Sequence, residues 1–265
     1  MTGANAVRVI VTRPAHEAPR WVAQLRQRGF DAVALPLITI LPAPDPAQLQ
    51  AARLSLDACR AVMFVSGNAV RQFFGHGADR LKWPAGLVAW ATGPGTRQAL
   101  IDEGVAPGLI SAPAADSAQF DSETLWMQVS PQVRQGDVVM IVRGADAAGT
   151  GRDWLSSHLA AAGAQVRTVV AYARAAPERI DGLDVNTVLD ATGDATEDAT
   201  RVWLFSSSQA IANLQTLLPD RDWSSARAIA THPRIAKAAR DAGFGVVCES
   251  RPDIDALSAA LESSR

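Results

Sequence analysis

Small polar residues follow buried apolar segments at six places, and these residues are the ones that could do chemistry. They are Thr12-Arg13, Ser66-Gly67-Asn68, Thr92-Gly93, Arg143-Gly144, Ser207-Ser208 and Thr231-His232. Where a strand of an open parallel sheet ends and a helix begins, free main-chain N–H groups point outward and bind carboxylates or phosphates. The pattern therefore predicts a site for an anionic ligand. The alternative is that the Ser, Thr and Asn side chains only cap the helices that follow, each contributing about 1 kcal/mol.

A single phenol is available for acid–base chemistry. Tyr172 is the only tyrosine, and it lies in the extended stretch "VVAYARA" (169–175). If its hydroxyl faces a ligand, it could donate a proton or a hydrogen bond. The alternative is that Tyr172 only packs within a linker.

Motifs of the common catalytic machineries are missing. The turn "TGPGTRQA" (92–99) lacks the third glycine and the acidic ribose anchor of a dinucleotide site. No GxxxxGK[ST] loop and no GxSxG elbow occur in the sequence. The four histidines and two cysteines do not have the spacing of a metal site. We therefore expect no metal and no nucleotide cofactor.

The polar residues need a scaffold, and short continuous apolar runs alternate with helical patterns along the chain. Such runs are typical of strands buried on both faces of a parallel sheet. Segments 18–29 and 152–163 place apolar residues three and four apart and end at glycine, as helices do. We predict strands at 7–11, 61–65, 87–91, 138–142, 202–205, 227–230 and 245–247.

This α/β pattern occurs twice. "AVMFVSGNAV" (61–70) resembles "VWLFSSSQAI" (202–211), and "ATGPGTRQALIDEG" (91–104) aligns with "ATHPRIAKAARDAG" (230–243). Two similar modules are predicted. Residues 30–46 and 164–180 each hold an extended stretch about twice the usual strand length, as a crossing between domains would. Two crossings would leave one module inserted in the other, whereas the alternative is two tandem halves divided near 130–135.

Composition restricts the classes of function. The 265 residues are 48% apolar and 20% charged, with a formal charge of −2 and no basic run, so we expect no nucleic-acid partner. No apolar stretch approaches the roughly 20 residues of a membrane helix. The first residues lack the pattern of a secretory signal. We expect a cytoplasmic protein.

Seven segments, in order and spacing, resemble the uroporphyrinogen-III synthase family. They are "VTRP", "FVSGNAV", "TGPGTRQAL", "IVRG…GRDWLSSHLAAAGAQV", "VVAYAR", "FSSSQAI" and "ATHPRIAKAARDAGF". The resemblance implies an α/β protein of two flavodoxin-like domains with parallel sheets, one inserted in the other. Domain 1 would comprise 1–36 and 175–265, domain 2 would comprise 43–168, and a two-stranded connector would comprise 37–42 and 169–174.

The resemblance also implies a reaction. Hydroxymethylbilane, a linear tetrapyrrole with eight carboxylates, would lose water and close to uroporphyrinogen III through a spiro intermediate, with its terminal pyrrole ring inverted. The family uses no metal and no organic cofactor, and we expect a monomer whose partner is this small molecule. Catalysis would come mainly from holding the substrate in one folded pose.

Family roles carry over to matching positions. Tyr172 corresponds to the connector tyrosine that would assist departure of the hydroxyl. Arg152 matches a further basic position, the acidic tract 190–200 looks like an insertion, and His232 replaces a glycine, which leaves its role open. The positions expected to bind substrate are Thr12, Arg13, Ser66, Gly67, Asn68, Thr92, Gly93, Arg143, Gly144, Ser207, Ser208, Thr231 and His232.

Two other functions fit the same pattern. One is a non-enzymatic two-domain binder of a small polyanion. The other is a nucleotide-dependent transferase on a Rossmann-like fold, which the missing glycine motif disfavours.

Overall fold

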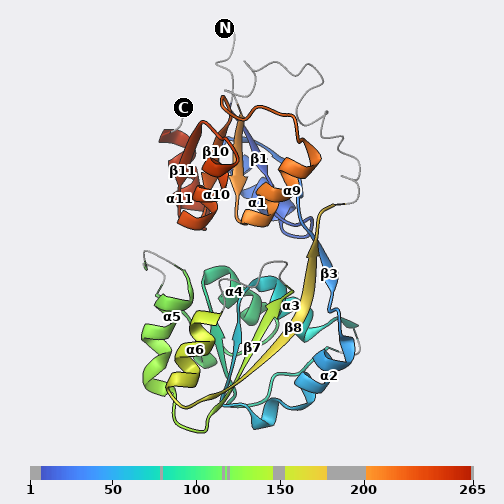
Figure 1. Cartoon of the computed structure of the whole chain (residues 1–265), viewed down its shortest axis with the longest axis vertical. Helices are drawn as coiled ribbons and strands as arrows, with labels where there is room; N and C mark the ends of the chain where they lie inside the picture. The colour runs from blue at the N-terminus through green and yellow to red at the C-terminus, as the bar shows by residue number, and fades with distance from the viewer. Residues whose placement is uncertain are drawn as a thin grey trace. The chain divides into compact units, whose positions relative to one another are not determined.

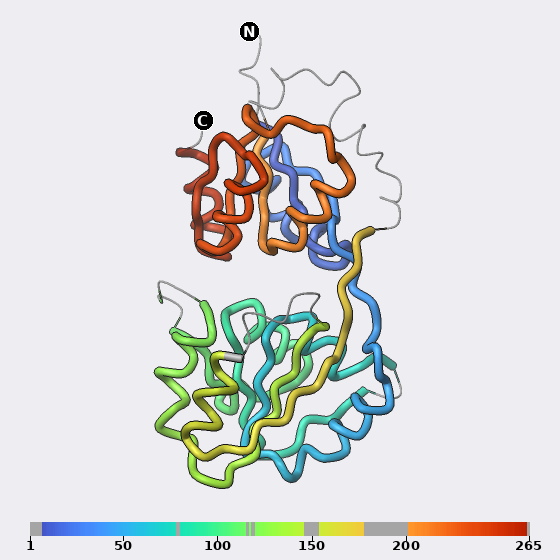
Figure 2. The backbone as a smooth tube through the Cα atoms, viewed as in Figure 1, coloured from blue at the N-terminus to red at the C-terminus, as the bar shows by residue number. Residues whose placement is uncertain are grey.

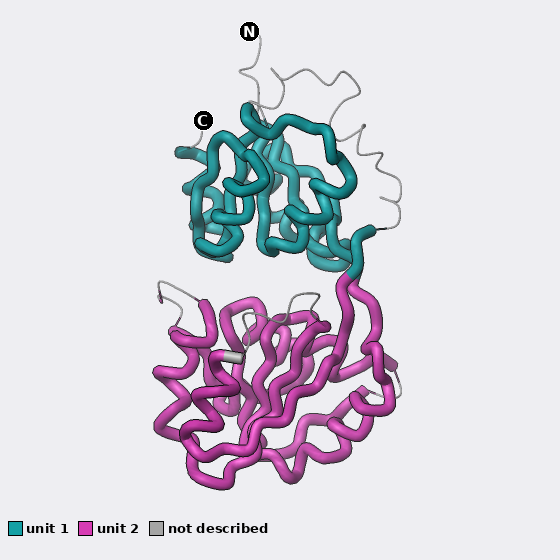
Figure 3. The backbone as a smooth tube through the Cα atoms, viewed as in Figure 1, with its two compact units in different colours: residues 1–39, 175–265 teal, residues 40–174 magenta. Residues whose placement is uncertain are grey.

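The chain forms two compact units in a computed structural model that describes residues 7–77, 80–114, 117, 120–145, 153–177 and 201–263. Unit 1 comprises Met1–Thr39 and Ala175–Arg265, and unit 2 comprises Ile40–Arg174 (Figure 3). Unit 2 is therefore inserted in the sequence of unit 1, and residues 130–135 lie inside it. The connector limits expected at 36–43 and 168–175 stay a prediction.

Unit 1 is built on a sheet of five strands in the order β11-β10-β9-β1-β2. Adjacent strands run parallel, as the short, wholly apolar runs predicted. Its elements, shown in Figure 1, are β1 (Arg8–Val11), α1 (Ala18–Gln27), β2 (Asp31–Ala34), β9 (Arg201–Phe205), α9 (Ser208–Leu217), β10 (Arg227–Ala230), α10 (Pro233–Asp241), β11 (Val246–Glu249) and α11 (Ile254–Ser263).

Both faces of this sheet are covered. Val9 and Val11 of β1 pack with Val22 of α1 and Leu257 of α11 in one buried cluster. Alternate residues of a strand point to opposite faces. Trp203 of β9 accordingly stacks in an aromatic group with Phe205, Trp223 and Phe244.

Unit 2 is built on a sheet of six strands in the order β3-β8-β7-β4-β5-β6. The pairs β8·β7, β7·β4, β4·β5 and β5·β6 are parallel. Its elements are β3 (Thr39–Pro42), α2 (Pro46–Leu54), η1 (Leu56–Ala58), β4 (Ala61–Phe64), α3 (Gly67–Phe74), β5 (Val88–Ala91), α4 (Pro94–Asp102), η3 (Pro107–Leu109), β6 (Ile110–Ser111), α5 (Ser122–Val129), η4 (Ser130–Gln132), β7 (Val138–Gly144), α6 (Asp153–Ala161) and β8 (Gln165–Ala175).

Helices cover both faces of this second sheet as well. Phe64 of β4 packs with Phe73 of α3 and Leu100 of α4 on one face. On the other face, Met63 packs with residues of α5 and α6 such as Leu125 and Leu159. The prediction of an α/β fold with two parallel sheets is confirmed.

The two sheets share one strand order, which explains the internal repeat. Reading β2-β1-β9-β10-β11 beside β8-β7-β4-β5-β6 pairs β9 with β4 and β10 with β5. These are the strands that carry the matching stretches 202–211 and 61–70, and 230–243 and 91–104.

The two long extended stretches have different structures. Segment 30–46 is not one overlong strand, because it is divided between β2 in the first sheet and β3 in the second (Figure 2). Proline at 36 has no N–H to donate to a sheet, which accounts for the interruption. In the second segment, the described residues 164–177 form one strand, β8, of 11 residues.

Candidate active site

The predicted site residues of unit 2 gather at one edge of its sheet. Ser66, Gly67 and Asn68 follow β4, while Thr92 and Gly93 follow β5. Arg143 and Gly144 end β7, and Tyr172 lies near the end of β8. Because β8, β7, β4 and β5 are adjacent and parallel, their carboxyl ends meet at this edge.

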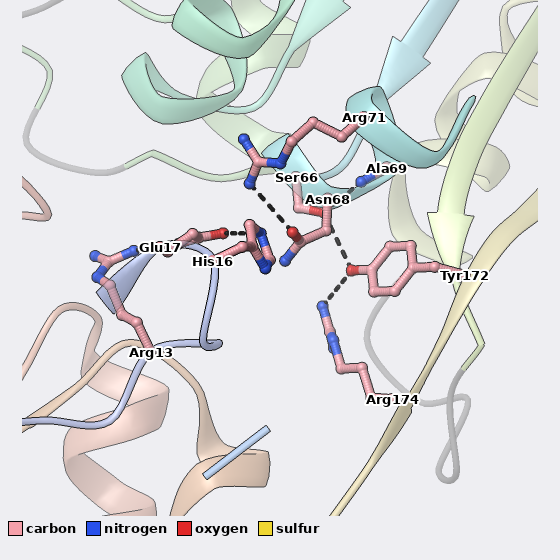
Figure 4. A network of polar contacts seen from close by, with 9 residues as sticks. All are labelled: Arg13, His16, Glu17, Ser66, Asn68, Ala69, Arg71, Tyr172 and Arg174. Carbon is pink, nitrogen blue, oxygen red and sulfur yellow. Dashed lines mark hydrogen bonds and ion pairs between the residues drawn. The ribbon is translucent and has the colours of Figure 1, made fainter. Parts of the chain in front are cut away.

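A hydrogen-bonded network is centred on the phenol of Tyr172 (Figure 4). The Tyr172 side chain is buried, with 0% of it exposed, and its hydroxyl lies 3.1 Å from Oγ of Ser66. Arg174 donates from Nη2 to the same phenol oxygen over 2.6 Å. Ser66 Oγ also accepts from the backbone N–H of Ala69 over 3.2 Å and so caps α3. The phenol oxygen is therefore held from two sides, by Ser66 and by Arg174.

A β-bulge places this phenol. Between β7 and β8, Arg143 pairs with Val170 and Gly144 pairs with Tyr172, so that Ala171 is an extra residue. A bulge of this kind re-aims the side chains that follow it and is common beside active sites. Ala171 and Tyr172 both join the buried cluster on the face covered by α3. The ring lies directly against Gly144, where a Cβ would be 2.6 Å from Cζ of Tyr172.

The other polar groups of this edge have partners of their own. The Thr92 hydroxyl donates to the Val65 carbonyl over 3.2 Å. Asn68 is buried and accepts through Oδ1 from Nη2 of Arg71 over 3.1 Å. Gly93 is buried at the N-terminus of α4. Because it has no side chain, only its main-chain groups could contact a ligand.

Arg143 differs from these residues because its guanidinium has no partner among the described residues. It is half-buried at the end of β7, and its Nε is buried without a hydrogen-bond partner. Across the described ranges, its guanidinium makes no hydrogen bond or ion pair. A buried donor without a partner costs about 1–3 kcal/mol, so a hydrogen-bond acceptor at this position would stabilise the Arg143 side chain.

The site residues of unit 1 also end adjacent parallel strands, β1, β9 and β10. Ser207 Oγ accepts from Gln209 N–H over 3.2 Å and caps α9. His232 Nδ1 accepts from Arg234 N–H over 3.1 Å and caps α10. Ser208 and Thr231 are half-buried beside these caps. Capping by Ser66, Ser207 and His232 is thus a role that the structure gives directly.

Two expected site residues of unit 1, Thr12 and Arg13, have partners within the unit. The Thr12 hydroxyl is no open donor, because only 1% of the residue is exposed and the hydroxyl donates to the Leu204 carbonyl over 2.8 Å. Arg13 already has partners, since Nη1 lies 3.2 Å from Oε2 of Glu17 and Cζ lies 4.0 Å from the Trp21 ring centre. Burial lowers the pKa of the Arg13 guanidinium, and Glu17 partly offsets that effect.

Sequence reasoning missed Arg174. The signal that could have found it is its spacing, because residues two apart on a strand point to the same face. Arg174 is two residues beyond Tyr172 on β8. Arg152 and the acidic tract 190–200 lie outside the described residues.

The described residues form neither a cluster of metal ligands nor a membrane-spanning helix. No group of three or more His, Cys, Asp or Glu residues there could hold a metal ion. None of the helices formed by those residues is long and apolar enough to cross a membrane.

The paired parallel sheets and their polar strand ends define a two-domain α/β protein. Solved structures share this fold. A mutant uroporphyrinogen III synthase from the extremely thermophilic bacterium Thermus thermophilus has a TM-score of 0.55 and 17% identity, with 98% of each chain covered. The uroporphyrinogen-III synthetase of Helicobacter pylori 26695 has a TM-score of 0.57 and 15% identity, with 97% of this chain and 99% of that chain covered.

Sequence comparison places the chain in a family. A model described as uroporphyrinogen-III synthase HemD matches residues 19–259, and the chain belongs to the uroporphyrinogen-III synthase family. A uroporphyrinogen-III synthase of Chlorobaculum parvum is 30% identical over 151 residues. That match spans 54% of this chain and 55% of the relative, so it covers about half of each protein.

Proposed function

We propose that this protein is a uroporphyrinogen-III synthase that acts on hydroxymethylbilane. It would cyclise and dehydrate this linear tetrapyrrole, with inversion of the terminal pyrrole ring through a spiro intermediate. The family match over residues 19–259 carries the proposal. The hydrogen-bonded phenol of Tyr172 supports it, because the reaction needs a proton at the departing hydroxyl.

The chemical step needs a proton donor rather than a strong nucleophile. As the hydroxymethyl C–O bond breaks, its electron pair stays on oxygen, which takes a proton and leaves as water. The pyrrole nitrogen stabilises the resulting carbocation as an azafulvenium ion. The substituted α-carbon of the terminal ring then bonds to this cation to give the spiro intermediate. Next, the bond from that carbon to its original methylene bridge breaks, which leaves a second azafulvenium ion, and the free α-carbon of the terminal ring bonds to the released methylene. The proton lost from this α-carbon on closure restores the donor. Tyr172, bonded to Ser66, is the group that we propose as this donor.

Substrate recognition would rely on donors at the strand ends of both units. Free main-chain N–H groups in the first turns of α3, α4, α9 and α10 suit carboxylates. Of the two arginines expected to bind substrate, Arg143 is the one whose charge has no partner among the described residues, whereas Arg13 is engaged by Glu17 and Trp21. Thr12 is left out of the proposed set because its hydroxyl and its main-chain N–H both donate to the Leu204 carbonyl.

The finer expectations from the sequence belong to the same proposal. They are a reaction without metal or organic cofactor, a monomeric enzyme and a cytoplasmic location. Gel filtration of the purified protein tests the monomer. Activity that survives dialysis against a chelator tests independence from metal.

The deciding experiment is an isomer assay. Purified protein is mixed with freshly made hydroxymethylbilane, and the oxidised products are separated into the I and III isomers. We expect the III isomer in excess of the I isomer, which forms by direct closure without the enzyme. If only the I isomer appears, while the protein still binds the substrate, the protein is a polyanion binder and the proposed activity is wrong.

A further inference from the structure

We propose that Arg174 is a positioning residue for the reaction and acts through the phenol of Tyr172. This inference rests on the proposed function. Its basis is the 2.6 Å hydrogen bond from Nη2 of Arg174 to the phenol oxygen, which no sequence motif predicted. Such a short bond from a charged donor is stronger than one between neutral groups.

A count of protons shows what Arg174 contributes. An arginine has donors and no acceptor, so the phenol oxygen must accept from Arg174 and cannot donate to it. The Tyr172 and Ser66 hydroxyls bring two protons, and the bond between them uses one. Ser66 Oγ also accepts from Ala69 N–H, which takes up no further proton. One hydroxyl proton of the pair therefore remains for a ligand. Because Arg174 can only donate to the phenol oxygen, that proton cannot be used in a hydrogen bond to Arg174.

The surroundings make Arg174 hard to replace. The phenol is 0% exposed, so bulk water cannot readily supply the hydrogen bond if Arg174 is removed. Gly144 lies directly against the ring, whereas Ser66 and Arg174 hold its oxygen. Arg174 itself is only half-buried, so its loss should disturb the phenol more than the core.

The chain carries its own probe of this contact. Tyr172 is the only tyrosine, so a protein labelled with ¹³C at the tyrosine Cζ gives one signal that needs no assignment. The chemical shift of Cζ responds to the hydrogen bonds of the phenol oxygen. It can be read without substrate and therefore does not depend on the proposed reaction.

The experiment compares Arg174→Met, Arg174→Lys and Tyr172→Phe, together with the double variant that joins the first and third. Arg167→Met is the matched control, because Arg167 lies on the same strand and is exposed. For each protein we would measure kcat, KM and the ratio of III to I isomer. The Cζ signal would be recorded for every variant that keeps Tyr172, and circular dichroism would check folding.

We expect Arg174→Met to shift the Cζ signal and to lower kcat about tenfold to a hundredfold, the range for a hydrogen bond to a charged group. Arg174→Lys should recover part of the loss, and Arg167→Met should change neither quantity. In the Tyr172→Phe background, removing Arg174 should change kcat less than about twofold, since residues that act as a unit are not additive.

Other outcomes overturn the inference. An unshifted Cζ signal in both Arg174 variants would mean that Arg174 does not hold the phenol. A rise in KM of equal size with and without the Tyr172 hydroxyl would assign Arg174 to substrate carboxylates instead. If Arg174→Met does not fold, the Cζ signal of Arg174→Lys decides. A wild-type protein that makes no III isomer refutes the proposed function but leaves the Cζ test valid.

Discussion

Replacing Gly144 with alanine should damage both stability and activity through Tyr172. The new Cβ would lie 2.6 Å from Cζ, 2.8 Å from Cε2 and 3.0 Å from Cε1 of the Tyr172 ring. Carbon atoms in contact sit about 3.5–4.0 Å apart, so the ring would have to retreat by about 1 Å. Gly144 is not among the residues with positive φ, so alanine adds no backbone strain and the effect is steric.

The size of the effect follows from what the ring cannot do. It is fully buried, and its oxygen is already 3.1 Å from Ser66, near the long end of hydrogen-bond distances. A retreat of about 1 Å would break that bond, and a misplacement of this size can lower a rate about a hundredfold. Adding one methyl group to a packed core costs about 1–3 kcal/mol.

The assay combines urea unfolding, turnover of hydroxymethylbilane and the isomer ratio. Gly108→Ala is the control, because a Cβ there meets nothing within 4 Å and Gly108 lies in the same unit. We expect Gly144→Ala to lower the free energy of unfolding and kcat, while Gly108→Ala changes neither. Wild-type stability and kcat in Gly144→Ala would refute the assignment of Tyr172 to this buried position.

Three further predictions concern charge. Ser207→Asp should raise KM, because it places a carboxylate among the N–H donors that would bind substrate carboxylates, while it still caps α9. Ser207→Asn should cap α9 equally well and leave KM nearly unchanged. Equal KM values for the two variants would contradict this site. Arg143→Met should raise KM about tenfold with little loss of stability, because the Arg143 guanidinium has no partner among the described residues. Arg13→Met should lower the free energy of unfolding by about 1–2 kcal/mol, because the contacts with Glu17 and Trp21 are lost. If Arg13→Met raises KM and Arg143→Met lowers stability, the two roles are exchanged. Burial raises the pKa of the Cys59 thiol, so less thiolate is present near neutral pH. Iodoacetamide should therefore alkylate Cys59 more slowly than free cysteine, as measured by peptide mapping. Alkylation as fast as that of free cysteine would contradict this.

Much of the scaffold could be predicted from the sequence. Buried runs such as 61–65 and 138–142 have no polar interruption, so β4 and β7 begin where periodicity placed them. The ends of the helices before Gly29 and Gly163 could also be predicted, because glycine is common just after a helix. The structure confirms the reason, since both glycines have the positive φ that favours glycine. Local patterns suffice for elements that are set by burial and by turn chemistry.

The details of the site could not be predicted in the same way. Alternation along β8 would put Ala171 and Tyr172 on opposite faces, and only the pairing with β7 reveals the bulge that brings them together. The Thr12 hydroxyl is satisfied by Leu204, a residue far away in the sequence. The role of Arg174 can be recognised only when the position of the Tyr172 hydroxyl is known. Each of these features depends on long-range contacts that a single sequence does not display.

Helix capping at the strand ends has a consequence for how this protein can vary. The side chains of Ser207 and His232 cap the helices that follow them, so the donors that remain at these two turns are main-chain N–H groups. Every residue type except proline supplies the same amide, so a mutation at these turns leaves the main-chain donor in place.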